Sequence, residues 1–301
     1  MYGGWVTFTG HLLWRDFNAK APLFKIKSKV ENKLRPFAFG LSYQNISKDA
    51  LSVMDKQVII AVDENNFEHL KHFKDPILFI HAMNEPNKKL LEFYKTCKRI
   101  ITIRTTIQQK LADMGVKADV SDIPFYQYPI TIKPKEKTEI ISMARVEFRK
   151  RQDIICKANQ ILTKQNKPTI KIYGEANRMY VYHKLKGMEF EKWYKGRYAQ
   201  DFTKHQELLS NAKYLVNLTF VPKDGGNLEY TLLQAIYHDT AVILHRSWVE
   251  VEHSKWKEGY NCLAIDDEKD LAGIVKTNPE TTSICKNAKK LLQAHIDSKW
   301  V

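Results

Sequence analysis

Short apolar runs rich in β-branched residues alternate with longer amphipathic stretches throughout this chain. The runs have the length of buried strands, and the stretches between or after them have the length and periodicity of helices. Because this alternation is typical of repeated βα units, it predicts an α/β protein whose sheets are largely parallel. In the first half the expected strands are 58–62, 77–80 and 100–103, and the expected helices are 86–97 and 105–114.

A polar segment that contains a proline, residues 130–137, divides the alternation and has the composition of a linker. The 301 residues also exceed the usual size of one domain. We therefore predict two Rossmann-like domains, residues 1–133 and 134–301, that face a central cleft at the carboxyl ends of their strands. After the linker, strands are expected at 139–144, 169–173, 214–218 and 241–244, and helices at 150–165, 203–211, 228–238 and 280–297.

Composition argues against several classes of protein and of site. No apolar run approaches the roughly 18 residues that a membrane-spanning helix requires, and the N-terminus lacks the charged and then apolar order of a secretion signal. The four cysteines form no CxxC pair and the ten histidines no HExxH motif, so neither a disulfide framework nor a metal site is indicated. Asp266 and Asp267 are expected in a solvated turn. We expect a cytoplasmic protein without a metal, a membrane association or an obligate protein partner.

The formal net charge of +14 is unusual for a metabolic enzyme. It is shared evenly, with +7 on residues 1–133 and +7 on residues 134–301, and no basic tail carries it. A strongly basic protein is suited to approach a polyanion, and nucleic acid is the leading candidate. If duplex DNA is the partner, we expect it to meet both domains or their common cleft. A generally lysine-rich proteome would also produce this charge.

Two cations follow the first strand expected after the linker. Arg145 and Lys150 stand five residues apart at the head of an expected helix. Arginine, with its planar fork, and lysine, as a point charge, can together neutralise a diphosphate. Cations at a helix start oppose the helix dipole, which favours a bound anion there. A solvated basic face shared with Arg149 and Arg151 is the structural alternative.

Glycine pairs precede two expected helices and would let backbone NH groups approach a phosphate or a sugar. After the second pair, Glu229 and Gln234 are polar groups on an otherwise apolar helix, and a carboxylate there can accept hydrogen bonds from both ribose hydroxyls. Stabilisation of the helix's own dipole is the alternative role for Glu229. The glycine segments are Gly3 and Gly4 near the N-terminus and Gly225, Gly226 and Asn227 in the second half.

Polar residues also follow the expected strand 77–80. His81 comes directly after it, and Asn84 and Glu85 are next. They are expected at the carboxyl end of a parallel strand, where Rossmann-like folds place ligands. Farther along, aromatic and basic residues interleave at 193–198 (WYKGRY), where a DNA edge or a nucleotide base could stack or the rings could pack the domain.

The order of these motifs resembles that of retaining GT-B glycosyltransferases. The shared features are an N-terminal Gly-Gly loop, a histidine at a strand end, an Arg-x4-Lys pair after the linker, and a late glycine-rich loop leading into an acidic helix. Within that group, residues 228–234 (LEYTLLQ) look most like the helix of the bacteriophage DNA α-glucosyltransferases that modify hydroxymethylcytosine, which has two glutamates at this spacing. Gln234 departs from that pattern, since an amide carries no charge.

The resemblance implies transfer of a sugar from a UDP-sugar to a hydroxymethylated pyrimidine in duplex DNA, with retention and without a metal. The N-terminal domain would serve the acceptor and the C-terminal domain the nucleotide-sugar. By the same resemblance Arg145 and Lys150 would hold the diphosphate, Glu229 the ribose, and the 225–227 loop the phosphates and sugar. His81 would touch the sugar near the reacting carbon. Gly3 and Gly4 would join the donor site with Gln234, and Asn84 and Glu85 would be acceptor-side candidates.

Two other functions remain open at this point. A glycosyltransferase acting on polysaccharide or glycoprotein would turn over without DNA. A non-catalytic DNA-binding protein on a degenerate transferase scaffold, which Gln234 favours, would hydrolyse no UDP-sugar. A dinucleotide oxidoreductase is poorly supported, because the GxGxxG fingerprint is absent.

Overall fold

The computed structural model describes residues 3–26, 38–40, 43–46, 57–60, 72–80, 88–133, 136–221 and 229–300. They belong to two compact units, Met1–Gln127 with Ala294–Val301, and Tyr128–Gln293. The last residues of the chain thus return to the first unit. The functional domains predicted from the sequence, 1–133 and 134–301, stay a prediction. None of the helices in the described ranges is long and apolar enough to cross a bilayer.

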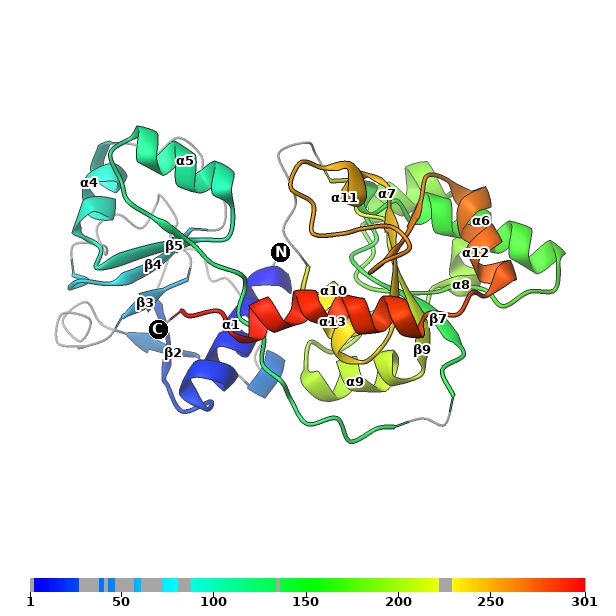
Figure 1. Cartoon of the computed structure of the whole chain (residues 1–301), viewed down its shortest axis with the longest axis horizontal. Coiled ribbons are helices and arrows are strands. Elements are labelled where there is room, and N and C mark those ends of the chain that lie inside the picture. The colour runs from blue at the N-terminus through cyan, green and yellow to red at the C-terminus, as the bar shows by residue number, and fades with distance from the viewer. Residues whose placement is uncertain are drawn as a thin grey trace. The chain divides into compact units, whose positions relative to one another are not determined.

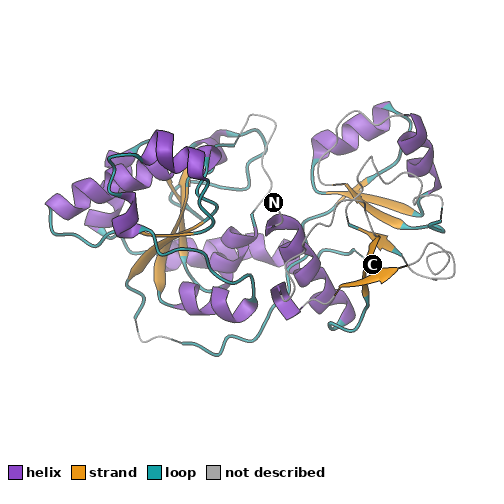
Figure 2. Ribbon diagram, turned by 180° about the vertical axis from the view of Figure 1, so that it is seen from behind, coloured by secondary structure: helices purple, strands orange, loops and turns teal. Residues whose placement is uncertain are grey.

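A four-stranded parallel sheet in the order β3-β4-β5-β6 forms the centre of the first unit. Leu78 of β4 and Leu111 of α5 are fully buried in its main apolar cluster, because the strands of a parallel sheet are continuous apolar runs that helices cover. Figure 2 shows the strands and the helices that accompany them. The elements are β3 Val58–Ile59, β4 Ile77–Ile80, α4 Lys88–Thr96, β5 Arg99–Thr102, α5 Thr105–Asp113 and β6 Asp119–Val120.

The chain enters this unit through helix α1, Gly3–Phe17, which begins at the glycine pair itself. Phe8 of α1 stacks on Phe79 of β4 with ring centroids 4.4 Å apart, and Trp300 packs edge-on against both rings. Residues far apart in sequence therefore close this core together. Strands β1 Leu23–Ile26 and β2 Tyr43–Ile46 form a separate two-stranded parallel sheet. The short helix η1 Ala38–Gly40 lies between them in the sequence.

The second unit is built on a five-stranded parallel sheet in the order β11-β10-β9-β7-β8. Its strands are β7 Glu139–Met143, β8 Lys171–Tyr173, β9 Ala212–Asn217, β10 Ala241–His245 and β11 Leu263–Ile265. Figure 1 shows α6 and α12 side by side on one face of this sheet and α9 and α10 on the other. The helices are α6 Gln152–Lys164, α9 Phe202–Ser210, α10 Tyr230–Tyr237, α12 Glu268–Thr277 and α13 Thr282–Ile296. The predicted α/β class with parallel sheets is confirmed.

Several short elements join these strands and helices. They are η3 Phe148–Lys150, α7 Arg178–Tyr180, the π-helix η4 Val181–Leu185, α8 Phe190–Trp193 and α11 Ser247–Glu250. The patterns in the sequence predicted neither β11 nor α12. Asp267, expected in a solvated turn, is the N-cap of α12 and accepts hydrogen bonds from Lys269 N and Asp270 N, which explains why the helix begins there. Asp266 pairs with Arg246 at 2.6 Å.

Candidate functional site

The loops after β7 and β9 meet at the carboxyl edge of the second unit's sheet. These strands are parallel neighbours, with Ile140 opposite Tyr214 and Ile141 opposite Leu215. Strand β8, the next in sequence after β7, pairs with the other side of β7, so the direction of winding reverses between β7 and β9. Open α/β sheets hold ligands at such a switch point, because the loops on its two sides diverge.

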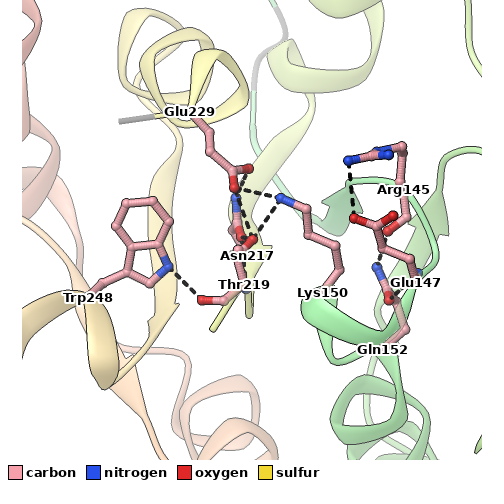
Figure 3. Close-up of polar contacts among 8 residues, drawn as sticks. All are labelled: Arg145, Glu147, Lys150, Gln152, Asn217, Thr219, Glu229 and Trp248. Atoms are coloured by element: carbon pink, nitrogen blue, oxygen red, sulfur yellow. Dashed lines mark hydrogen bonds and ion pairs between the residues drawn. The ribbon is translucent and has the colours of Figure 1, made fainter. Parts of the chain in front are cut away.

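Four polar side chains form a cluster at this point, which we call the switch-point cluster: Lys150, Asn217, Thr219 and Glu229 (Figure 3). Lys150 Nζ lies 2.5 Å from Glu229 Oε1 and donates to Thr219 Oγ1 at 2.9 Å. Asn217 Nδ2 donates to the second carboxylate oxygen, Glu229 Oε2, at 2.9 Å. The Thr219 hydroxyl lies 2.5 Å from Asn217 Oδ1 and 3.1 Å from Glu229 Oε1. Lys150 and Glu229, which the sequence singled out separately, are thus in direct contact.

The Lys150–Glu229 pair is largely withdrawn from solvent, with 13% and 27% of the two side chains exposed. Burial by itself would raise the pKa of the Glu229 carboxyl. The charge of Lys150 and hydrogen bonds from Lys150, Asn217 and Thr219 outweigh that effect and hold this pKa below its ordinary value. The carboxylate is therefore ionised at neutral pH.

A tight turn between β7 and α6 presents Lys150 to this cluster. Lys150 closes the single turn η3, so it stands before α6 and not within it. Gln152, fully buried, donates from its amide to Arg145 O at 2.9 Å and accepts from Glu147 N at 3.3 Å. Because one buried side chain ties both ends of the segment 145–147, the turn has a defined shape.

Arg145 leaves the same turn in another direction. Its Nη2 lies 3.2 Å from Glu147 Oε1, and 46% of its side chain is exposed. Figure 3 shows the Arg145 guanidinium directed at Glu147 while the Lys150 ammonium is directed at Glu229. Both predicted cations therefore lie at the carboxyl edge of the sheet, but each is neutralised by its own carboxylate.

Trp248 and Ser247 hold the segment that follows β9. Trp248 is almost fully buried, and its Nε1 donates to Thr219 O at 2.9 Å. Ser247 Oγ accepts from Val221 N at 3.1 Å. Asn217, Thr219 and Trp248 were not predicted from the sequence. A signal existed for Asn217, since it is a polar residue at the end of an otherwise apolar strand, where ligand-facing groups are expected.

Gln234 has a different environment from Glu229, since Glu229 is the N-cap of α10 and Gln234 lies in the middle of that helix. It is fully buried, and its Nε2 lies 2.7 Å from His205 Nδ1. Desolvation, followed by the charge of His238, lowers the pKa of His205 to about 3, so this imidazole stays neutral. Contact between Gln234 and a donor stays a prediction.

The aromatic and basic segment 193–198 packs into the unit. Trp193 is buried, and Tyr194 stacks on Phe190 with centroids 4.8 Å apart. The Tyr194 hydroxyl also donates to Gly174 O at 2.7 Å. This segment was considered for stacking with DNA or a nucleotide base and for packing of the domain. For Trp193 and Tyr194 the structure shows packing.

Several predicted site residues are not in the switch-point cluster. Gly3 and Gly4 are the first residues of α1, in the first unit. Among the side chains of the described ranges, no group of three His, Cys, Asp or Glu residues could hold a metal ion. The candidates that lie outside the described residues are His81, Asn84 and Glu85 after β4, and Gly225, Gly226 and Asn227 before α10.

The switch-point cluster retains unused hydrogen-bonding capacity. An ammonium group has three N–H donors, and two of those of Lys150 are accounted for by Glu229 and Thr219. A carboxylate has about four acceptor sites, and Lys150, Thr219 and Asn217 account for three of those of Glu229, so one is left for a ligand hydroxyl. The arrangement is therefore chemically able to bind an anion and a hydroxyl group side by side.

No protein-family model matches this chain, and no curated protein matches it in sequence. Its fold is nevertheless similar to that of solved structures. HepE from Anabaena, in complex with UDP and glucose, matches with a TM-score of 0.66 at 12% identity, over 99% of this chain and 93% of that chain. An α-glucosyltransferase in complex with UDP and a 13-mer DNA containing an HMU base matches with a TM-score of 0.66 at 13% identity, over 98% and 92%.

A mutant of TarM from S. aureus, in a complex that includes UDP, matches with a TM-score of 0.55 at 16% identity, over 82% of this chain and 52% of that chain. At such low identities these similarities show the fold alone. The chain has an α/β fold of GT-B type, which confirms the fold class predicted from the sequence.

Proposed function

We propose that this protein is a glycosyltransferase that moves a sugar from a UDP-sugar to a hydroxyl group with retention of anomeric configuration. The switch-point cluster is the observation that carries the proposal. It combines an ammonium group and an ionised carboxylate at the sheet edge where open α/β folds bind nucleotides. The similarity of fold to structures that hold UDP supports this class of donor.

In this proposal the switch-point cluster binds the nucleotide part of the donor. Glu229 accepts a hydrogen bond from a ribose hydroxyl, and Lys150 and Arg145 contact the diphosphate. As the bond from the sugar C1 to the diphosphate oxygen breaks, its electron pair leaves with UDP, and positive side chains stabilise the charge that develops there. The acceptor oxygen forms the new bond to C1 and its proton is released. These two cations take the electrostatic role that a divalent metal has elsewhere.

The remaining donor and acceptor contacts are extensions of the same proposal. Backbone NH groups of the segment 225–227 would approach the phosphates and sugar, and Gly3 and Gly4 would complete the donor site from α1. His81 would lie near the reacting carbon. Asn84 and Glu85 would face the acceptor, and Gln234 would support the ribose side of the site.

A hydroxymethylated pyrimidine in duplex DNA is the acceptor that we propose. The net charge of +14 favours a polyanionic substrate, and one structure of similar fold holds DNA with an HMU base. The reaction requires that the modified base leave the stack, since its hydroxyl must reach C1 of the donor. A polysaccharide or glycoprotein acceptor is the second candidate, because one structure of similar fold, the TarM mutant, holds Fondaparinux and α-GlcNAc-glycerol together with UDP.

Transfer of radiolabelled sugar tests the proposal directly. UDP-glucose and other UDP-sugars are incubated with the protein and duplex DNA containing hydroxymethylated pyrimidines, beside unmodified DNA. Label on the modified DNA alone is the expected result. Slow release of UDP without labelled DNA would move the acceptor to polysaccharide or protein, and no turnover of any UDP-sugar would leave a non-catalytic DNA-binding protein.

A matched variant connects the reaction to the switch-point cluster. Glu229→Gln keeps the shape of the side chain but removes the charge that Lys150 and the ribose would share. We expect its Michaelis constant for the donor to rise by about tenfold or more, the amount typical of losing a hydrogen bond to a charged group. An unchanged Michaelis constant would remove Glu229 from the donor site.

A further inference from the structure

Exposed aromatic and basic side chains gather around α7 and η4 of the second unit. Six large apolar side chains are exposed among the described residues, and three of them lie here: Phe148 at 49%, Met179 at 59% and Tyr182 at 62%. Phe148 belongs to this surface because its ring packs edge-on against Tyr180 of α7 with centroids 4.9 Å apart. We call this the α7–η4 surface, formed by Phe148, Arg178, Met179, Tyr182, His183, Lys184 and Lys186.

The charge of the α7–η4 surface is entirely positive. Residues 176–188 contain Arg178, Lys184 and Lys186 and no aspartate or glutamate. The carboxylates that flank this stretch have their own cations, since Glu175 lies 2.5 Å from Arg197 and Glu189 lies 3.8 Å from Lys192. Within the described residues no ion pair is found for the three cations, so their charge is available to an external anion.

The aromatic rings of this surface are held in place by neighbouring side chains and by buried residues beneath them. Lys186 Nζ lies 5.4 Å from the centroid of the Tyr182 ring, and His183 packs edge-on against that ring at 4.9 Å. Below them Tyr180 and Leu185 are buried, and the Tyr180 hydroxyl is tied to α6 by a hydrogen bond to Asp153. Tyr182 belongs to η4 and Lys186 is its C-cap, and η4 is a π-helix, a rare conformation that is frequent at functional sites.

Exposed rings beside unpaired cations match the chemistry of a nucleic-acid strand, because phosphates bind cations and an unstacked base stacks on an aromatic ring. We propose that the α7–η4 surface contacts DNA, with Tyr182 stacking on a base and Arg178, Lys184 and Lys186 binding phosphates. A solvated basic face alone would not explain three exposed apolar side chains in the same place. The inference rests on the proposed DNA acceptor, and it adds that the nucleotide-sugar unit itself helps to hold the DNA.

DNA binding by charge-reversal variants tests the cationic part of this surface. Anisotropy of a labelled duplex with a hydroxymethylated pyrimidine is followed at several salt concentrations for Lys184→Glu/Lys186→Glu. The matched control, Lys276→Glu/Lys286→Glu, makes the same charge change at exposed positions of α12 and α13 in the same unit. We expect the logarithmic salt slope of the first variant to become shallower by about 2, and its affinity to fall well below that of the control.

The aromatic part of the surface is tested by Tyr182→Ala beside Tyr182→Phe. Loss of a ring that stacks on a base weakens binding on the order of tenfold, whereas phenylalanine keeps the stacking surface. Inorganic polyphosphate, which has no base, serves as the second probe and should bind Tyr182→Ala as it binds the natural protein. Equal DNA affinity for Tyr182→Ala and the natural protein, or equal losses in the two charge-reversal variants, would overturn the inference.

Failure of this inference and failure of the proposed function give different results. Each variant is first titrated with UDP, which should bind unchanged because the α7–η4 surface shares no residue with the switch-point cluster. If the natural protein glucosylates modified DNA while the surface variants bind DNA normally, DNA contact by the α7–η4 surface is refuted and the proposed function stands. If the surface variants lose DNA binding but the natural protein transfers no sugar to DNA, DNA contact by the surface stands and the proposed DNA acceptor is refuted.

Discussion

Replacing Lys150 with methionine tests how strongly the switch-point cluster depends on its ion pair. Methionine keeps the length and apolar stem of the lysine but removes the charge and the donors. The Glu229 carboxylate then remains at 27% exposure with only the hydrogen bonds from Asn217 and Thr219. The variant therefore creates a half-buried charge without its counter-charge, which costs free energy of folding.

The expected magnitude follows from burial. Breaking a buried pair by removing one partner costs about 3–5 kcal/mol, and exposed pairs contribute about 0–1 kcal/mol. With 13% and 27% of the side chains exposed, we expect the free energy of unfolding at pH 7 to fall by about 2 kcal/mol. Adding Glu229→Gln removes the unpaired carboxylate, so the double variant should regain about 1 kcal/mol.

Urea unfolding of the natural protein, the two single variants and the double variant measures this coupling. The Lys150→Met deficit should shrink as the pH is lowered, because the unpaired carboxyl of Glu229 then takes up a proton. Additive effects of the two substitutions, with a coupling energy below about 0.5 kcal/mol, would show that the contact between the two side chains contributes nothing.

Ligand binding by the same variants separates the two halves of the proposed donor site. Uridine carries the ribose without the phosphates, so Lys150→Met should bind it normally while losing about tenfold or more in affinity for UDP. Glu229→Gln should weaken both ligands. A Lys150→Met protein that binds UDP and uridine as the natural protein does would refute the assignment of Lys150 to the diphosphate.

Three further outcomes are expected. Trp248→Phe removes the hydrogen bond to Thr219 O and part of a buried ring, and should raise the Michaelis constant for the donor severalfold and lower the free energy of unfolding by about 2 kcal/mol; an unchanged constant would mean that this bond does not position the cluster. Burial is the main reason why the pKa of His205 is lowered to about 3 and that of His238 to about 4. Below the ordinary histidine pKa, the unfolded chain therefore binds more protons at these two residues than the folded chain does. The free energy of unfolding should thus be level above about pH 6.5 and fall by up to about 2.7 kcal/mol per pH unit toward pH 4, and a level profile in urea titrations would contradict this. Trp300→Ala should destabilise the first unit by about 3–5 kcal/mol in thermal unfolding, since the ring is 1% exposed; a shift near zero would show that the chain end does not complete that core.

The strands and helices that the sequence predicted share long, unbroken patterns. Residues 77–80 are four apolar side chains in a row, and β4 has those bounds. β11 was missed because three residues, 263–265, give too short a run to stand out, although Asp267 at the N-cap marks the start of the following helix. Trp300 shows a second limit, since nothing local in the sequence indicates that it packs on Phe8 and Phe79.

The candidate site shows the same division between local and long-range information. Lys150 and Glu229 were recognised from their separate motifs, but their contact joins residues 79 apart. It exists because β7 and β9 are neighbours, and strand order cannot be read from a periodic pattern. Gln234 illustrates the reverse case, because its buried partner His205 comes from another helix and gives it an environment unlike that of Glu229.

The free energy that it costs to bury the polar groups of the switch-point cluster is itself an argument for a ligand. A buried ion pair is seldom more stable than well-packed apolar residues of similar volume. Here Asn217 and Thr219 also donate hydrogen bonds to Glu229, and Trp248 donates one to the backbone oxygen of Thr219. So many polar contacts around one half-buried pair gain little for the core of the unit. They are better explained by the need to hold an ammonium group and a carboxylate in fixed positions, at the edge where a nucleotide would require both.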